Sequence, residues 1–306
     1  MTSQPDAISL AERVLSILDE GSFSATYKYA LFTGLLDLCI EGVSRSGIPP
    51  TTVTTRQLAG KVVDIYWPQA VPYAGHGTLR QGGVRHDSQA EIVRRIAQDR
   101  AAWAGSETDT VFRARLRHPR QFDRLLDFVE WKLIEMPIPR LQVLGRREDR
   151  FLYDYNWTDK VRQSSVSAYQ GGRPSSFDNR LLLKPGVAEH LVRLNGVLRP
   201  LFRRAWTLMV AGMNRLPQAE LEVFLFGTDR VPLDAVRSPL LDLQSGRCFY
   251  CDGTVGTHGE VDHFVPWSRY ADDGLDNLVV AHPRCNNSKR DFLAASEHVK
   301  RWTVRM

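Results

Sequence analysis

Apolar side chains recur at intervals of three and four residues through much of the first 235 residues, which places them on one face of an α-helix. The spacing predicts two helices within residues 8–45 and another from Pro119 to Glu135. It predicts two more at 186–198 and 200–216, separated where a proline interrupts the apolar pattern. This part of the chain is therefore expected to be mainly α-helical.

Other stretches of the same region lack helical spacing. The segment Thr52–Val63 predicts a short strand followed by a small helix, and Phe151–Trp157 predicts a strand. The stretch Ser164–Ser176 is rich in Ser, Gly and Gln and predicts a loop. No internal repeat is visible, and no motif indicates what the region does.

A helix start signal marks the expected domain boundary. Ser238 is a favourable N-cap, Pro239 suits the first helical position, and Gly246 stands where a C-terminal cap belongs. We therefore expect a mainly helical domain over residues 1–235 and a second domain over residues 236–306.

Composition and charge exclude some classes of protein. The hydrophobic share of 43% and charged share of 25% are typical of a folded globular chain. No run of 18 apolar residues is present and the N-terminus lacks a secretory pattern, so we expect a cytoplasmic protein without a membrane span. Residues 236–306 carry nine basic and nine acidic side chains, so the net charge of +5 belongs to the first 235 residues. Any non-specific attraction to DNA is expected there.

The cysteines point to a metal site. Cys39 lies in an apolar stretch and is expected to pack as a small hydrophobic residue. The others fall into two pairs with the spacing of zinc knuckles, in which His replaces the first Cys of the second pair: Cys248 with Cys251, and His282 with Cys285. A tetrahedral Cys₃His set is closed to water, so the zinc would be structural. The alternative is a set of buried free cysteines.

Between and after the knuckles stand Asp262-His263, then Asn277, then Asn286 three residues before Lys289. In this order and spacing the C-terminal segment resembles the HNH endonuclease family. The resemblance implies a ββα-metal fold, with Asp262-His263 on the first strand, a second strand near residues 278–281 and a helix from about 285. The expected fold class is α+β: a mainly helical N-terminal domain followed by a small ββα-metal domain with a structural zinc knuckle.

The resemblance also implies the roles of the site residues. Cutting a phosphodiester needs an activated water and a Lewis acid on the phosphate. His263 is the candidate base, because a neutral imidazole accepts a proton near pH 7. Asp262 and Asn286 are implied as ligands of one Mg²⁺ or Mn²⁺. Strict strand alternation puts Asp262 and His263 on opposite faces, so their convergence rests on the resemblance and requires a local distortion.

Three further residues complete the expected site. Asn277 is expected to hold the loop and to orient the His263 imidazole through a backbone contact. Lys289 and Arg290 are candidates for contacts with the scissile or neighbouring phosphate.

These features predict a metal-dependent DNA endonuclease that nicks one strand as a monomer. An HNH module behind an unrelated domain resembles bacterial restriction and phage-defence nucleases, including nuclease subunits of multi-component systems such as Zorya, so protein partners are also expected. Two alternatives stay open: a zinc-dependent nucleic-acid-binding module that does not cleave, and a nuclease directed at RNA. The sequence does not indicate the oligomeric state.

Overall fold

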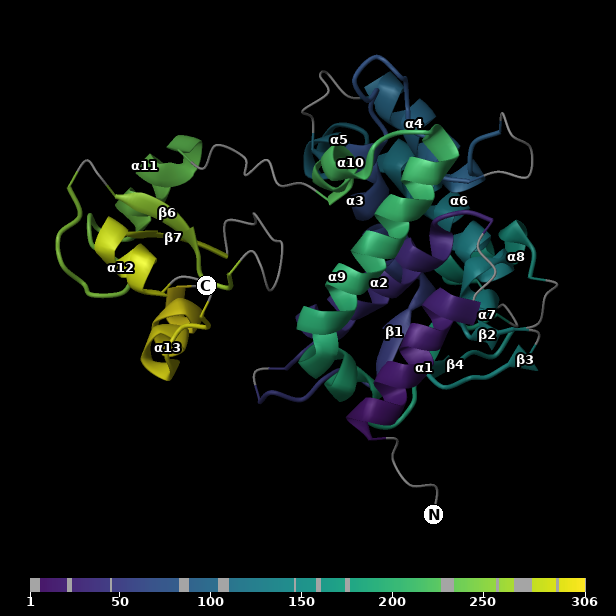
Figure 1. Cartoon of the computed structure of the whole chain (residues 1–306), viewed down its shortest axis with the longest axis horizontal. Coiled ribbons are helices and arrows are strands. Elements are labelled where there is room, and N and C mark those ends of the chain that lie inside the picture. Colours follow the sequence, from purple (N-terminus) through teal and green to yellow (C-terminus); the bar gives the residue numbers. More distant parts are fainter. Residues whose placement is uncertain are drawn as a thin grey trace. The chain divides into compact units, whose positions relative to one another are not determined.

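The computed structural model describes residues 6–20, 24–44, 46–82, 88–103, 110–145, 147–157, 161–173, 177–226, 234–256, 259–266, 277–289 and 292–305. Within these ranges helices predominate and the strands are short, as expected (Figure 1). The chain divides into two compact units, Met1–Phe226 and Gly227–Met306. We refer to them as the N-terminal unit and the C-terminal unit.

The helices of the N-terminal unit follow the apolar spacing of the sequence. The two helices predicted within residues 8–45 are present, and the helix from Pro119 to Glu135 has the predicted bounds. The bounds are α1 (Ala7–Glu20), α2 (Tyr27–Glu41), α3 (Thr55–Gln69), α4 (Glu91–Trp103), α5 (Val111–Arg117), α6 (Pro119–Glu135), α7 (Pro137–Leu141), α8 (Gln163–Gln170), α9 (Val187–Asn214) and α10 (Gln218–Phe226).

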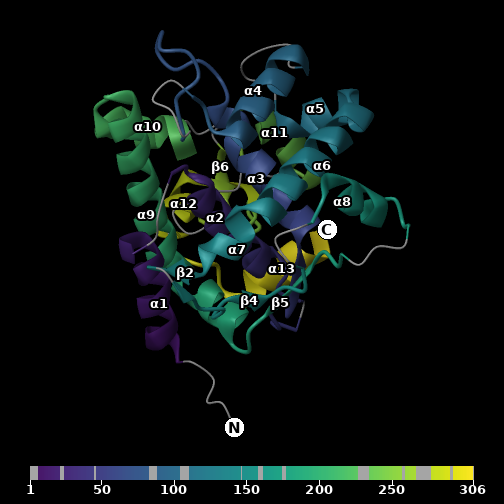
Figure 2. The same cartoon turned by 90° about the vertical axis from the view of Figure 1, so that its right-hand side faces the viewer.

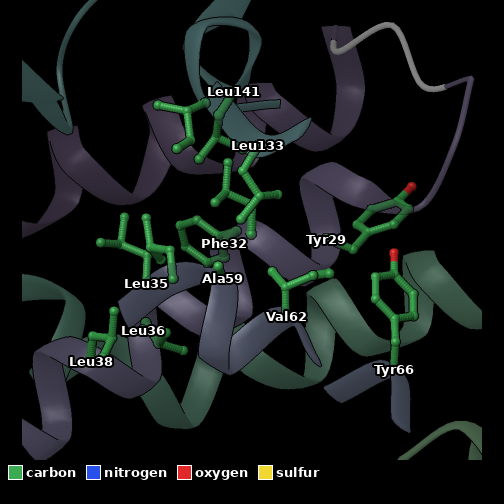
Figure 3. Packing of buried hydrophobic residues seen from close by; sticks show 14 of the residues in the cluster. Tyr29, Phe32, Leu35, Leu36, Leu38, Ala59, Val62, Tyr66, Leu133 and Leu141 are labelled. Atoms are coloured by element: carbon green, nitrogen blue, oxygen red, sulfur yellow. The ribbon is translucent and has the colours of Figure 1, made fainter. Parts of the chain in front are cut away.

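The core of the N-terminal unit centres on α2 and α3. Helix α9 packs along α2, and α1 packs against α9 (Figures 1 and 2). Phe32 of α2 stacks on Phe202 of α9 with ring centroids 3.9 Å apart. Side chains of α2 and α3 meet Leu133 of α6 and Leu141 of α7 (Figure 3). Cys39 is fully buried among them, and burial raises the pKa of its thiol to about 12. It packs as a small hydrophobic residue, as predicted.

Short strands form two small sheets in this unit. The strands β1 (Thr52–Thr54), β5 (Arg180–Leu183) and β4 (Tyr153–Asp154) form an antiparallel sheet in the order β1-β5-β4. The strands β2 (Val143–Leu144) and β3 (Arg147–Glu148) pair with each other. The strand predicted at Thr52 is confirmed, and the one predicted between 151 and 157 is confirmed for two residues.

Two predictions for this unit are wrong. Helix α9 continues through Pro200, although an internal proline loses one backbone hydrogen bond and crowds the preceding turn. Burial of Leu198 and Phe202 on either side of it offsets that cost. Helix α8 overlaps the stretch predicted as a loop, and its Val166 is buried in the core. Tertiary burial decided the structure at both places.

The C-terminal unit is built on an antiparallel hairpin. Strand β6 (Glu260–His263) pairs with β7 (Leu278–Ala281), with Asp262 opposite Val279 and His263 opposite Leu278. Helix α11 (Asp234–Leu243) contacts both strands, and α12 (Pro283–Lys289) contacts β6. Helix α13 (Ser296–Arg305) ends the unit (Figure 1).

Helix α11 begins at Asp234, so the predicted start at Pro239 is wrong. Pro239 lies inside the helix, next to the buried Leu240. Gly246 follows the helix with a φ of +71° and donates its N–H to the carbonyl of Leu241. No helix in the described ranges is both long enough and apolar enough to span a membrane.

Candidate zinc site and candidate active site

Two tight turns of the C-terminal unit bring four metal-binding side chains together. The thiols of Cys248, Cys251 and Cys285 and a ring nitrogen of His282 place one ligand atom each within 4.8 Å of one another. Three sulfur donors and one imidazole are the donor set of a structural tetrahedral zinc site. The four residues paired by their spacing in the sequence therefore share one site that fits zinc.

The His282 ring is oriented for this purpose. Its Nδ1 lies 3.2 Å from the Cys251 Sγ, and its Nε2 lies 2.9 Å from the carbonyl oxygen of Thr254. A ring nitrogen that donates to a carbonyl leaves a lone pair on the other nitrogen for a metal. The backbone N–H of Gly253 is the main cause that lowers the pKa of the Cys251 thiol to about 6, which favours the thiolate.

Asp262 is held by two donors. Tyr250 donates its hydroxyl to the Asp262 Oδ2 at 2.6 Å, and the Lys289 Nζ lies 3.0 Å from the same oxygen. The side chain of Asp262 is 12% exposed and that of Lys289 is 7% exposed. Burial, and then the charge of Asp262, raise the pKa of Tyr250 well above its usual value, so its hydroxyl stays protonated.

Asn286 stands on α12, one turn before Lys289, and faces the same strand. Its Nδ2 donates to the Glu260 Oε2 at 2.9 Å. Glu260 and Asp262 are two residues apart on β6 and share one face of the hairpin. Helix α12 therefore lies across this face, with the side chains of Asn286 and Lys289 bonded to β6. The structure places Asn286 and Lys289 of α12 against the strand that carries Asp262.

His263 is the last residue of β6. It is 6% exposed, and its carbonyl oxygen accepts a hydrogen bond of 2.8 Å from the Lys289 Nζ. The register with β7 is regular through His263, so its side chain leaves the strand on the face opposite Asp262. The Lys289 ammonium therefore contacts both the Asp262 carboxylate and the backbone carbonyl of His263, where β6 ends.

Asn277 fixes the chain that follows His263. Its Oδ1 accepts from the N–H of Val265 at 2.7 Å, and its Nδ2 donates to the carbonyl of Val265 at 3.1 Å. The Asn277 carbonyl also accepts from the N–H of Phe264 at 2.7 Å. Asn277 is 3% exposed, so these bonds satisfy an amide that would otherwise be costly to bury. Together they tie the end of β6 to the start of β7.

One segment of the C-terminal unit matches a known protein family. Residues 248–295 match the family described as HNH endonuclease. This segment belongs to the HNH endonuclease family. The resemblance inferred from the motifs is confirmed. No curated protein and no solved structure matches the chain.

The HNH segment also contains oxygen donors of the kind that bind a divalent metal ion. The Asp262 Oδ2 is occupied by Tyr250 and Lys289, and the Asn286 amide nitrogen by Glu260. The two remaining donors are hard oxygens, Oδ1 of Asp262 and Oδ1 of Asn286. Mg²⁺ and Mn²⁺ prefer such oxygen ligands and keep water at their other positions. The donor chemistry therefore fits a divalent ion of this kind.

Sequence reasoning missed two residues of the HNH segment, Glu260 and Tyr250. Glu260 could have been found, since strand alternation puts it on the face of Asp262. Tyr250 gives no such signal, because a hydroxyl within a zinc knuckle does not indicate a partner 12 residues away on a strand. Arg290, expected at a phosphate, lies outside the described residues.

Proposed function

We propose that the C-terminal unit is a metal-dependent endonuclease of the ββα-metal type that hydrolyses phosphodiester bonds in DNA. The observation that supports it best is the pairing of β6 with α12, in which Lys289 contacts Asp262 and Asn286 contacts Glu260, inside a segment of the HNH family. A zinc site of four ligands next to this pairing supplies the rigid support that such a small unit needs.

Each proposed role is assigned to a side chain of the HNH segment. Asp262 and Asn286 would hold one Mg²⁺ or Mn²⁺ through their Oδ1 atoms. When bound, that ion would polarise the scissile phosphate and offset charge on the departing oxygen. The His263 imidazole would accept the proton of the attacking water. This role of His263 is supported by the HNH family match and requires its ring to reach the face of β6 that carries Asp262.

Asn277 and Lys289 would support the site by holding the chain around His263. Asn277, bonded to Val265, would hold the segment that carries His263. Lys289 is a candidate phosphate contact, but its observed bonds to Asp262 and to the His263 carbonyl favour a role in holding β6. Lys289 would have to leave them to reach DNA. Arg290 is the other candidate for the phosphate.

The proposed biological setting is based on the order of the two units along the chain. We propose a cytoplasmic nuclease of bacterial restriction or anti-phage defence, because a separate helical unit precedes the HNH segment. The helical unit would then recognise DNA or a protein partner. One HNH segment is matched in the chain, so a monomer would nick one strand at a time.

The test is cleavage of supercoiled plasmid by the full chain with Mg²⁺ or Mn²⁺. We expect nicked circles from the wild type and a loss of at least about 100-fold in rate for His263→Ala, the usual contribution of a general base. His76→Ala, which removes an exposed histidine of the N-terminal unit, is the matched control. Leaving out the divalent salt, rather than adding a strong chelator, keeps the zinc in place.

Other outcomes would favour the alternatives. Cleavage of a matched RNA in preference to DNA would identify an RNA-directed nuclease. A wild type that retains zinc and binds DNA but cuts neither nucleic acid would indicate a binding module. Unchanged cleavage by His263→Ala would refute the assignment of the base.

A further inference from the structure

Tyr250 connects the zinc knuckle to Asp262 on β6. It lies inside the first zinc knuckle, between Cys248 and Cys251, and its hydroxyl reaches Asp262 on β6 at 2.6 Å. Its ring is fixed by edge-on contacts with Phe249 and His298, with centroids 5.5 Å and 5.4 Å apart. The position of the hydroxyl is therefore set by the knuckle and by the packing around it.

The two donors on Asp262 select one of its oxygens. Tyr250 and Lys289 both bind Oδ2, which fixes the rotation of the carboxylate and turns Oδ1 away from them. A ligand that is already ordered loses less rotational freedom when it binds a metal. The two donors differ in charge, however. The ammonium of Lys289 repels a divalent cation, whereas the neutral hydroxyl of Tyr250 orders the carboxylate without that repulsion.

We infer that Tyr250 is a positioning residue, which ties the zinc knuckle to Asp262 and presents the Asp262 Oδ1 to the catalytic divalent ion. The inference rests on the proposed function, because it takes Asp262 as a ligand of that ion. The zinc knuckle then contributes to the affinity of the second metal site through this hydrogen bond. Groups that orient metal ligands in this way typically change metal affinity about 10- to 100-fold when they are removed.

A purely structural role for the Tyr250 hydroxyl predicts a different effect of its removal on metal affinity. If Tyr250 only satisfied a buried polar group, its loss would lower the stability of the unit and leave the affinity for the metal unchanged. The affinity must therefore be measured apart from activity and beside stability.

The experiment measures Mn²⁺ binding to the zinc-loaded full chain without DNA, from the electron paramagnetic resonance signal of free Mn²⁺. Tyr250→Phe removes only the hydroxyl. Asp262→Ala removes a proposed ligand, so the Mn²⁺ binding that this variant loses is assigned to the proposed metal site. Tyr155→Phe is the matched control, because its hydroxyl bonds to Glu148 at 2.9 Å on the exposed surface of the N-terminal unit. Zinc content and thermal unfolding are recorded for every variant.

We expect Tyr250→Phe to weaken Mn²⁺ binding about 10-fold or more while zinc stays at one ion per chain. The Mn²⁺ concentration for half-maximal nicking should rise by the same factor, with most of the rate regained at saturating Mn²⁺. Tyr155→Phe should bind as the wild type does. Tyr250→Leu removes the same donor, so a shift shared with Tyr250→Phe assigns the effect to the hydroxyl.

The outcomes separate this inference from the proposed function. Wild-type Mn²⁺ affinity in Tyr250→Phe with zinc retained would overturn the inference, whereas nicking by the wild type would still support the nuclease. If Tyr250→Phe and Tyr250→Leu lower zinc content or the unfolding temperature without moving the Mn²⁺ affinity, Tyr250 is structural and the inference fails. If the wild type has no Mn²⁺ site that Asp262→Ala removes, the proposed metal site itself fails, and this inference with it.

Discussion

Both ring nitrogens of His282 have a partner, so a substitution of this residue tests the zinc site directly. Its Nδ1 faces Cys251 while its Nε2 bonds to the carbonyl of Thr254. We expect His282→Ala to lose zinc and with it the folded C-terminal unit, because metal binding and folding are coupled in such small sites. We expect His282→Cys to retain zinc, because it turns the second knuckle into a Cys-x-x-Cys pair and a Cys₄ set also binds zinc.

Zinc content by elemental analysis, together with far-UV circular dichroism, tests this expectation. Cys39→Ala is the control, since Cys39 is buried in the N-terminal unit and should not affect zinc. Retention of zinc by His282→Ala, or its loss from Cys39→Ala, would show that the ligand set is misassigned.

The residues of the site differ in how far the sequence reveals them. Cys248, His282 and Asp262 are recognisable because their chemistry requires those residue types at fixed spacing. The partner of Asp262 is not, because the Tyr250 hydroxyl reaches it only after the knuckle packs against β6. Motif reasoning therefore finds metal ligands and misses the donors that orient them.

At the scale of elements, Gly259 packs closely against Val255 and against Val280 of β7. A Cβ at this position would lie 2.5 Å from the Val255 Cγ1 and 2.9 Å from the Val280 Cγ1. We expect Gly259→Ala to destabilise the C-terminal unit by about 1–3 kcal/mol, the usual cost of overpacking. Gly256→Ala is the matched control, because a Cβ there would meet no atom within 4 Å.

Chemical denaturation followed by circular dichroism measures both glycine variants. The double variant Gly259→Ala with Val255→Ala should recover part of the loss, since it removes the nearer clash. Equal stability of the Gly259 and Gly256 variants would contradict the close packing of this loop.

Pro200 gives the opposite prediction for a helix. It is exposed within α9, where its ring prevents a hydrogen bond to the carbonyl of Gly196. We expect Pro200→Ala to stabilise the N-terminal unit by about 2 kcal/mol, the gain of a continuous helix less the entropy that proline removes from the unfolded chain. Pro119→Ala at the first turn of α6 should give no such gain, because no N–H is needed there.

Thermal unfolding compares the two proline variants. A lower midpoint for Pro200→Ala than for the wild type would show that the proline relieves a strain that the regular helix would carry.

The same proline shows where element prediction fails. Apolar spacing gave α1, α2 and α6, because each buries one face and local spacing reports that face. It failed at α8, α9 and α11, where Gly, Ser or Pro signals predicted a break or a different start. Such signals express local preferences of about 1–3 kcal/mol, which burial of one or two large side chains can exceed.

At the scale of the whole molecule, the two units have separate hydrophobic cores. The largest cluster of buried residues runs from Leu10 to Leu225 within the N-terminal unit. The C-terminal unit has two small clusters, one around Leu240 and Val280 and one around Phe264 and Val279. Cores this small rarely hold a unit of some 80 residues by themselves, so zinc is expected to supply much of its stability.

Removal of zinc should therefore unfold one unit and spare the other. With a chelator strong enough to extract zinc, we expect amides of β6 and β7 to lose protection from hydrogen exchange, while amides of α2, α3 and α9 keep theirs. Mass spectrometry of peptides from the exchanged chain measures this, and adding zinc back should restore the protection. Loss of protection in α2 or α9 would mean that the N-terminal core depends on the zinc-bound unit. Because the N-terminal core is built from its own helices, with Phe32 stacked on Phe202, that dependence would require a contact beyond those that build it.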